Sequence, residues 1–101
     1  MDQSYKAWLK VNNKPVPMNR FVEDFIARTT AGAVASLKGG DDIQNLELHG
    51  NKGTIEIKVN STEIPLTPFP NDLILSTIRG MISSLKDVDG VDKIDIVVEV
   101  K

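Results

Sequence analysis

Apolar and polar residues alternate with period two in four stretches of the chain. The clearest stretches are residues 54–59 and 93–100, and shorter ones run over 7–11 and 46–48. Such alternation is typical of a β-strand with one buried face and one wet face. The sequence therefore predicts four main strands.

Short turn sequences lie next to these strands. The pairs at 12–13 and 60–61 are Asn-Asn and Asn-Ser, and they predict β-hairpins with short return arms at 16–18 and 63–66. Residues 50–53, Gly-Asn-Lys-Gly, predict a tight turn between two antiparallel strands. Each half of the chain should thus carry a small hairpin arm beside its opening strand.

Apolar residues recur at helical spacing in two further stretches. Asn19 in the first and Thr67 with Pro68 in the second are typical of a helix start, because a polar cap and a proline at the first position both suit it. Glycines at 39–40 and the acidic run 87–90 predict the helix ends. The predicted buried stripes comprise Phe21, Val22, Phe25, Ile26, Thr29, Ala33, Val34 and Leu37 in the first helix, and Phe69, Leu73, Ile74, Ile78, Met81, Ile82 and Leu85 in the second.

The two halves of the chain repeat each other. Residues 10–48 align with 58–96 without a gap, at a shift of 48, and 13 of the 39 positions are identical. Average residue usage would give only about two or three identities by chance. Each unit is too small to close its own core. We therefore expect a single domain over residues 1–101 in which two copies of a duplicated unit pack together.

The order of these elements predicts the fold class. Without the two hairpin arms it reads βαββαβ, which predicts an α+β, ferredoxin-like two-layer sandwich with strand order 4-1-3-2 and both helices on one face of an antiparallel sheet. The alternative is a different pairing of two ββαβ units, in which the arms extend the sheet to six or more strands. The internal repeat favours the ferredoxin-like arrangement, because that topology has a pseudo-twofold axis that relates its halves.

Gly32 and Gly80 occupy equivalent positions inside the two predicted helices. A glycine there costs about 1 kcal/mol relative to alanine, so a close contact should offset the cost. We expect the two helices to meet near these glycines, with Ser36 and Ser84 one turn later. Space for a ligand is the alternative explanation.

Composition and charge narrow the class of protein. The 101 residues are 41% hydrophobic and 26% charged, as in ordinary globular domains. The net charge of −2 provides no broad positive field, so neither nucleic acid nor an anionic membrane is an expected partner. Cysteine is absent from the sequence, and no apolar run approaches the roughly 20 residues of a membrane span. A cytoplasmic location is the expectation.

Motifs of catalysis or cofactor binding are missing from the sequence. There is no Gly-x-Ser-x-Gly and no glycine-rich phosphate loop. His49 is the single histidine and is predicted near the end of an edge strand, with Glu47 as its neighbour. The acidic run at 87–92 has only part of a calcium loop's ligand pattern, since position 98 is a valine. The expectation is a protein that is not an enzyme and has no metal or cofactor.

One aromatic residue stands out on the predicted open face of the sheet. Strand alternation places Trp8 there, between Lys6 and Lys10 and beside the strand that carries Val97. An exposed aromatic at the centre of a sheet, with charged residues around it, can anchor a protein partner. The alternatives are that Trp8 folds over the lysine stems or the amino-terminal tail, or that the strand phase is shifted by one residue.

The function hypothesis follows from these features. We expect a noncatalytic scaffold or protein-interaction domain that associates with a second copy or a partner protein through Trp8, Val97, Lys6 and Lys10. The alternative is a small-molecule-binding or enzymatic domain with a cleft between the helices and the hairpin arms. These hypotheses differ in which surface is occupied.

Overall fold

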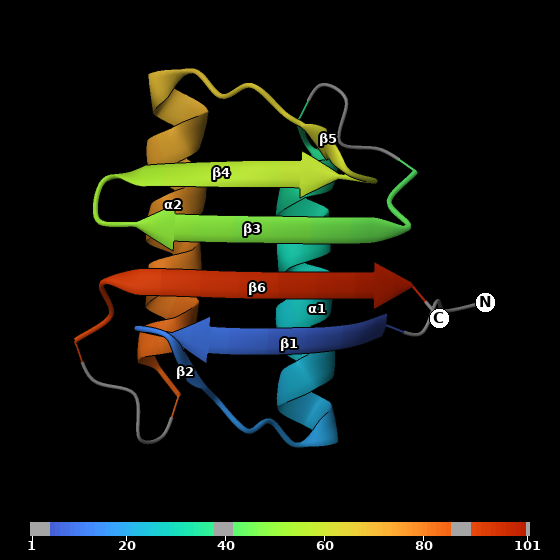
Figure 1. The fold of residues 1–101 in the computed structure, drawn as a ribbon, viewed down its shortest axis with the longest axis vertical. Coiled ribbons are helices and arrows are strands. Elements are labelled where there is room, and N and C mark those ends of the chain that lie inside the picture. The colour runs from blue at the N-terminus through green and yellow to red at the C-terminus, as the bar shows by residue number, and fades with distance from the viewer. Residues whose placement is uncertain (1–4, 38–41, 86–89, 101) are drawn as a thin grey trace.

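The computed structural model describes residues 5–37, 42–85 and 90–100. Within them, the elements are β1 (Tyr5–Val11), β2 (Lys14–Pro15), α1 (Arg20–Ala35), β3 (Asn45–Asn51), β4 (Thr54–Val59), β5 (Thr62–Glu63), α2 (Pro68–Ser83) and β6 (Lys93–Val100). Both helices lie on one face of the sheet, antiparallel to each other, and run across the strands (Figure 1). The predicted helix ends at 39–40 and 87–89 lie outside the described residues.

The fold is α+β, with two helices on an open six-stranded antiparallel sheet of order β2-β1-β6-β3-β4-β5. The predicted ferredoxin-like order is wrong, because it places β1 between β6 and β4. In the structure, β2 folds back onto one edge of β1 after the two-residue turn and pairs with it at Lys10 and Val11. Part of that edge is therefore taken by β2, and β4 pairs with β3 and β5 instead. The alternative with arms that extend the sheet describes the structure.

Equivalent elements of the two halves are 48 residues apart, most clearly α1 and α2. The sheet order is symmetric between the halves: replacing every strand by its equivalent in the other half gives the same order read from the opposite edge. Strand β1 pairs with β6, and β4 pairs with β3, so each opening strand pairs with the closing strand of the other half. The central pair, β3 with β6, joins the two halves. A twofold rotation about the viewing axis of Figure 1 would approximately exchange the halves.

The predicted hairpin turns form, and their asparagines hold the halves together. Asn12 has a φ of 52° and Asn60 the same value, a left-handed conformation that asparagine tolerates. The Oδ1 atom of Asn12 accepts from the backbone N–H groups of residues 92–93, at 3.1 and 2.8 Å. Asn60 accepts from residues 44–45 in the same way, at 2.9 and 3.0 Å. Each turn thus binds the start of a strand in the central pair.

Both helices begin where the sequence predicts. Asn19 caps α1, since its Oδ1 accepts the backbone N–H of Val22 at 2.8 Å. Thr67 precedes α2 without a side-chain cap bond, and Pro68 occupies the first turn. Ser36 and Ser84 then occupy the C-cap positions.

The core lies between the helices and the covered face of the sheet. Its fully buried large apolar side chains come from both halves: Ile26, Val34, Leu46, Leu48, Ile57, Ile78, Ile82, Ile94, Ile96 and Val98. Because they form one cluster, the halves share one interior. None of the described helices is long and apolar enough to cross a membrane.

Part of each predicted helical stripe is not in the core. Phe21 and Phe69 are each 73% exposed, Phe25 is 50% and Leu73 is 54% exposed. The reason is that each helix has apolar residues on two faces. Positions such as Ile26 face the sheet, whereas these four residues lie on the side turned away from it.

The predicted contact between the helices at Gly32 and Gly80 is also wrong. Both glycines are exposed, and a Cβ atom built on either would have no neighbouring atom within 4 Å. The two glycines lie on the same outward side as Phe25 and Leu73. Nothing within the described part of the chain explains why a glycine is needed there.

Candidate interaction surface

The predicted strand phase is correct, so the open face of the sheet carries the expected residues. On β1 the burial alternates, with Ala7, Leu9 and Val11 buried and the lysines and Trp8 exposed. The other strands add charged or polar residues to this face: Glu47, His49, Glu56, Lys58, Lys93, Asp95 and Glu99. Apolar side chains on the open face are therefore few.

The register places Trp8 directly opposite Val97 on the neighbouring strand. Val97 in turn lies opposite Glu47 of β3. Lys6 and Lys10 lie on either side of Trp8 along β1 and opposite Glu99 and Asp95. The four residues predicted to bind a partner thus come together in one patch, which we call the Trp8 patch (Trp8, Val97, Lys6, Lys10).

Trp8 is 44% exposed and packs against a lysine on its own strand. The Nζ atom of Lys6 lies 5.3 Å from the centre of the indole ring, a cation–π arrangement. Trp8 also lies close to the edge of the sheet and not at its centre, since β2 covers only the last two residues of β1. One predicted alternative, an indole packed on a lysine, is therefore part of the arrangement.

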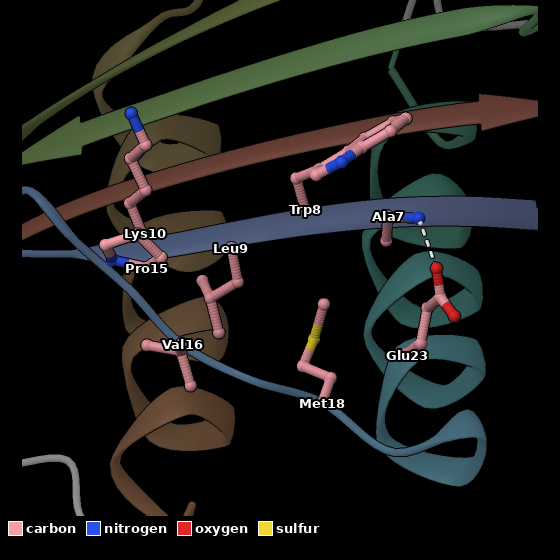
Figure 2. A pocket seen from close by; sticks show the side chains of 8 residues that line it. All are labelled: Ala7, Trp8, Leu9, Lys10, Pro15, Val16, Met18 and Glu23. Atoms are coloured by element: carbon pink, nitrogen blue, oxygen red, sulfur yellow. Dashed lines mark hydrogen bonds between the residues drawn. The ribbon is translucent and has the colours of Figure 1, made fainter.

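A pocket opens along this edge, next to the indole (Figure 2). Its volume is about 340 Å³, and Ala7, Trp8, Leu9, Lys10, Pro15, Val16, Met18 and Glu23 line it. Val16 and Met18 lie in the connection that leaves β2 for α1, on the other side of the pocket from β1. The Glu23 carboxylate accepts the outward-facing N–H of Ala7 at 2.9 Å, which protects the strand edge there. The pocket lies between β1, the hairpin arm and the start of α1, which is where the alternative function hypothesis expects a cleft.

The two halves differ most clearly around this pocket. Asn71 is the equivalent of Glu23, and its Oδ1 accepts the N–H of Ile55 at 3.0 Å, which protects the other edge in the same way. By contrast, the residue equivalent to Trp8 is Glu56, and the residue equivalent to Pro15 is Glu63. The aromatic wall and the proline therefore belong to the first half alone, whereas Val16 and Met18 have apolar equivalents in Ile64 and Leu66.

His49 lies between carboxylates on the same open face. Its Nδ1 atom is 2.6 Å from Asp95 Oδ1, and its Nε2 atom is 3.5 Å from Glu47 Oε1. The prediction that its strand is at the edge is wrong, because β3 pairs with β6 and β4 on its two sides. Glu56 occupies the paired position on β4. His49 thus has acidic partners that orient the ring, but the positions paired with it supply no nucleophile.

Among residues 5–37, 42–85 and 90–100, no group of three or more histidines, cysteines or carboxylates is placed to hold a metal ion. The carboxylates on the open face instead lie opposite basic residues, as Lys10 with Asp95 and Lys58 with Glu47. Cross-strand pairs of opposite charge stabilise a sheet modestly. This arrangement accounts for the charges without a ligand.

A relative of known function would point to a partner. No protein-family model, no curated protein and no solved structure matches the chain. The surfaces of the chain itself are therefore the basis for a functional proposal.

Proposed function

We propose that the chain is a noncatalytic protein-interaction domain that associates with a second copy of itself through the Trp8 patch. The observation that carries the proposal is the exposed indole of Trp8 beside Val97, in a face that is otherwise charged. Tryptophan is among the residues most enriched at the energetic centres of interfaces, where a polar rim surrounds it. The Trp8 patch has this composition.

The distribution of charge favours a second copy as the partner. The exposed charges of β1 on the open face are basic, Lys6 and Lys10, whereas those at the middle and end of β6 are acidic, Asp95 and Glu99. Two copies related by a twofold axis can place the basic strand of one against the acidic strand of the other. A face with one sign of charge could not do this.

Sedimentation equilibrium over a range of concentrations tests the proposal. Trp8→Ala should raise the dissociation constant of this association roughly 30-fold or more, the effect of losing an interface centre. Glu56→Ala is the matched control, because it changes the equivalent position of the other half, and it should leave the association unchanged. Equal association of the wild type and Trp8→Ala would contradict the proposal.

The second candidate function is small-molecule binding, favoured by the pocket beside Trp8. Its volume of about 340 Å³ falls within the range of ligand pockets, roughly 300–1,000 Å³. It also combines apolar walls with two charged groups, Glu23 and Lys10. A fragment screen by NMR should then shift the Met18 methyl signal without any dependence on protein concentration. Shifts that depend only on protein concentration would argue against this candidate.

A further inference from the structure

The side of the helices that faces away from the sheet carries a second apolar surface, which we call the outer helix face. It consists of Phe21, Phe25 and Gly32 on α1 and of Phe69, Leu73 and Gly80 on α2. At 100° per residue these positions fall on one stripe of each helix, opposite the buried residues. The stripe of α2 is the stripe of α1 shifted by 48 residues, with Leu73 in place of Phe25.

The exposed apolar area on the outer helix face is large for a chain of this size. The four large side chains are between 50% and 73% exposed. If each offers about 200 Å² when fully exposed, they present roughly 500 Å² together. Because the helices are antiparallel, Phe21 and Phe25 lie at one end of this face, and Phe69 and Leu73 lie at the other end (Figure 1). A partner that covers both ends would bury more than half of the roughly 800 Å² that each partner buries in a stable interface.

The outer helix face also contains a hollow. A pocket of about 160 Å³ lies between the first half of α1 and the last turns of α2, and its lining is almost entirely apolar: Phe21, Val22, Phe25, Ile26, Met81, Ser84 and Leu85. Phe21 and Phe25 form one wall, with ring centres 6.0 Å apart. Protruding rings and an apolar hollow on one surface are the features that a self-complementary interface needs.

Gly32 and Gly80 give an independent reason to expect a close neighbour on this surface. Each weakens its helix by about 1 kcal/mol relative to alanine, and each faces open space in the isolated chain. A glycine on an exposed helix lets another backbone approach closely. The same residue at the same place in both halves fits a neighbour that contacts both halves alike.

We propose that a second copy of the chain docks on the outer helix face, so that the helices of two copies pack against each other. The internal repeat makes the two ends of this face nearly equivalent, which suits an interface in which each copy presents the same patch. Charge offers little opposition. On α1, Arg28 next to this face is paired with Asp24 at 2.9 Å. On α2 the only charged residues are Asp72 and Arg79, and the Arg79 guanidinium donates to the Lys52 carbonyl. This interface lies on the opposite side of the molecule from the Trp8 patch.

Sedimentation equilibrium of the full chain carrying Trp8→Ala isolates this interface, because the other proposed contact is then removed. We expect the wild type, which has both contacts, to form assemblies larger than a dimer and the Trp8→Ala protein to form only a dimer. Adding Phe21→Ser with Phe69→Ser should raise the dissociation constant roughly 100-fold or more, because two central aromatic side chains are lost. Since both phenylalanines are exposed, the circular dichroism spectrum should not change.

A second pair of variants separates docking from folding. Gly32→Gln with Gly80→Gln should raise the thermal midpoint, because glutamine is a better helix former and the space is open. The same change should weaken the dimer, because the longer side chains hold the partner's helices apart. A monomeric Trp8→Ala protein, or a dimer unaffected by either pair of substitutions, would overturn the proposal.

Discussion

Thr30 shows at the scale of one residue how the two halves differ inside the core. It is fully buried in α1, and its hydroxyl has no hydrogen-bond partner among the described residues. The equivalent residue in α2 is Ile78, which is also fully buried. Burying a hydroxyl without a partner costs about 1–3 kcal/mol in protein mutational data, so Thr30 weakens the fold.

Thr30→Val should therefore stabilise the protein. The substitution keeps the branched shape and removes the unpaired hydroxyl, so the free energy of unfolding should rise by about 1 kcal/mol. Urea unfolding at neutral pH measures this directly. A loss of stability would mean that the hydroxyl has a partner after all, and Thr30→Ser, which keeps the hydroxyl, then serves as the control.

On the open face, the sequence correctly predicted which single residues are exposed. Alternation along β1 placed Trp8, Lys6 and Lys10 on the exposed side, because a strand has a fixed period of two. It could not predict that Lys6 packs on the indole or that Glu23 protects the edge at Ala7. Those contacts depend on side-chain rotamers and on how α1 lies relative to β1, which periodicity does not specify.

At the scale of elements, β3 and α2 pack together through a small residue on the strand and a large residue on the helix. Gly50 of β3 is buried, and a Cβ atom added there would lie 3.1 Å from Leu75 Cδ1 of α2. The equivalent residues, with the halves exchanged, are Val98 of β6 and Ala27 of α1, both buried. Each pair takes its strand residue from one half and its helix residue from the other: Gly50 with Leu75 is small with large, and Val98 with Ala27 is the reverse.

This pairing predicts that the effect of Gly50→Val on stability changes sign when Leu75 is replaced by alanine. Gly50→Val alone should lower the free energy of unfolding by about 1–3 kcal/mol, because it overpacks the contact with Leu75. Leu75→Ala alone should cost about 2–5 kcal/mol through the cavity it leaves. In the Leu75→Ala protein, Gly50→Val should instead increase stability, since it refills the space. Equal effects of Gly50→Val in both backgrounds, measured by urea unfolding, would rule out the size exchange.

The elements and the exposed faces of the strands were largely predictable, but the buried faces of the helices were only partly so. The cap at Asn19, the proline at position 68 and the alternation of the strands all describe local preferences, and the structure has them. The assignment of Phe21 and Phe69 to the core failed because a helix that is apolar on two sides does not reveal which side meets the sheet. Gly32, which lies on the same stripe of α1 as Phe21, was the available signal that this side of the helix faces outward.

At the scale of the whole molecule, the repeat was visible in the sequence and the strand order was not. Identity at a shift of 48 predicts two similar units that share a core, and the buried cluster contains residues from both. The ferredoxin-like order failed because β6 lies between β1 and β3, and the turn at Asn12 places β2 on part of the other β1 edge. Competition for one strand edge is a tertiary effect, so neither half reveals it alone.

The observed order also means that neither half has a sheet of its own. In the first half, β1 and β3 are separated by β6, and in the second half, β4 and β6 are separated by β3. Each half keeps only its hairpin, and a two-stranded hairpin is at best marginally stable in water. Folding of the chain therefore requires that the two halves pair with each other.

The most direct test of this shared core is to produce residues 1–52 and 53–101 as separate peptides and follow their folding by NMR and circular dichroism. Each peptide alone should be unfolded or should fold only as a dimer of itself. An equimolar mixture should recover the dispersed spectrum and the cooperative urea unfolding of the intact chain. A peptide that folds cooperatively as a monomer would contradict the account.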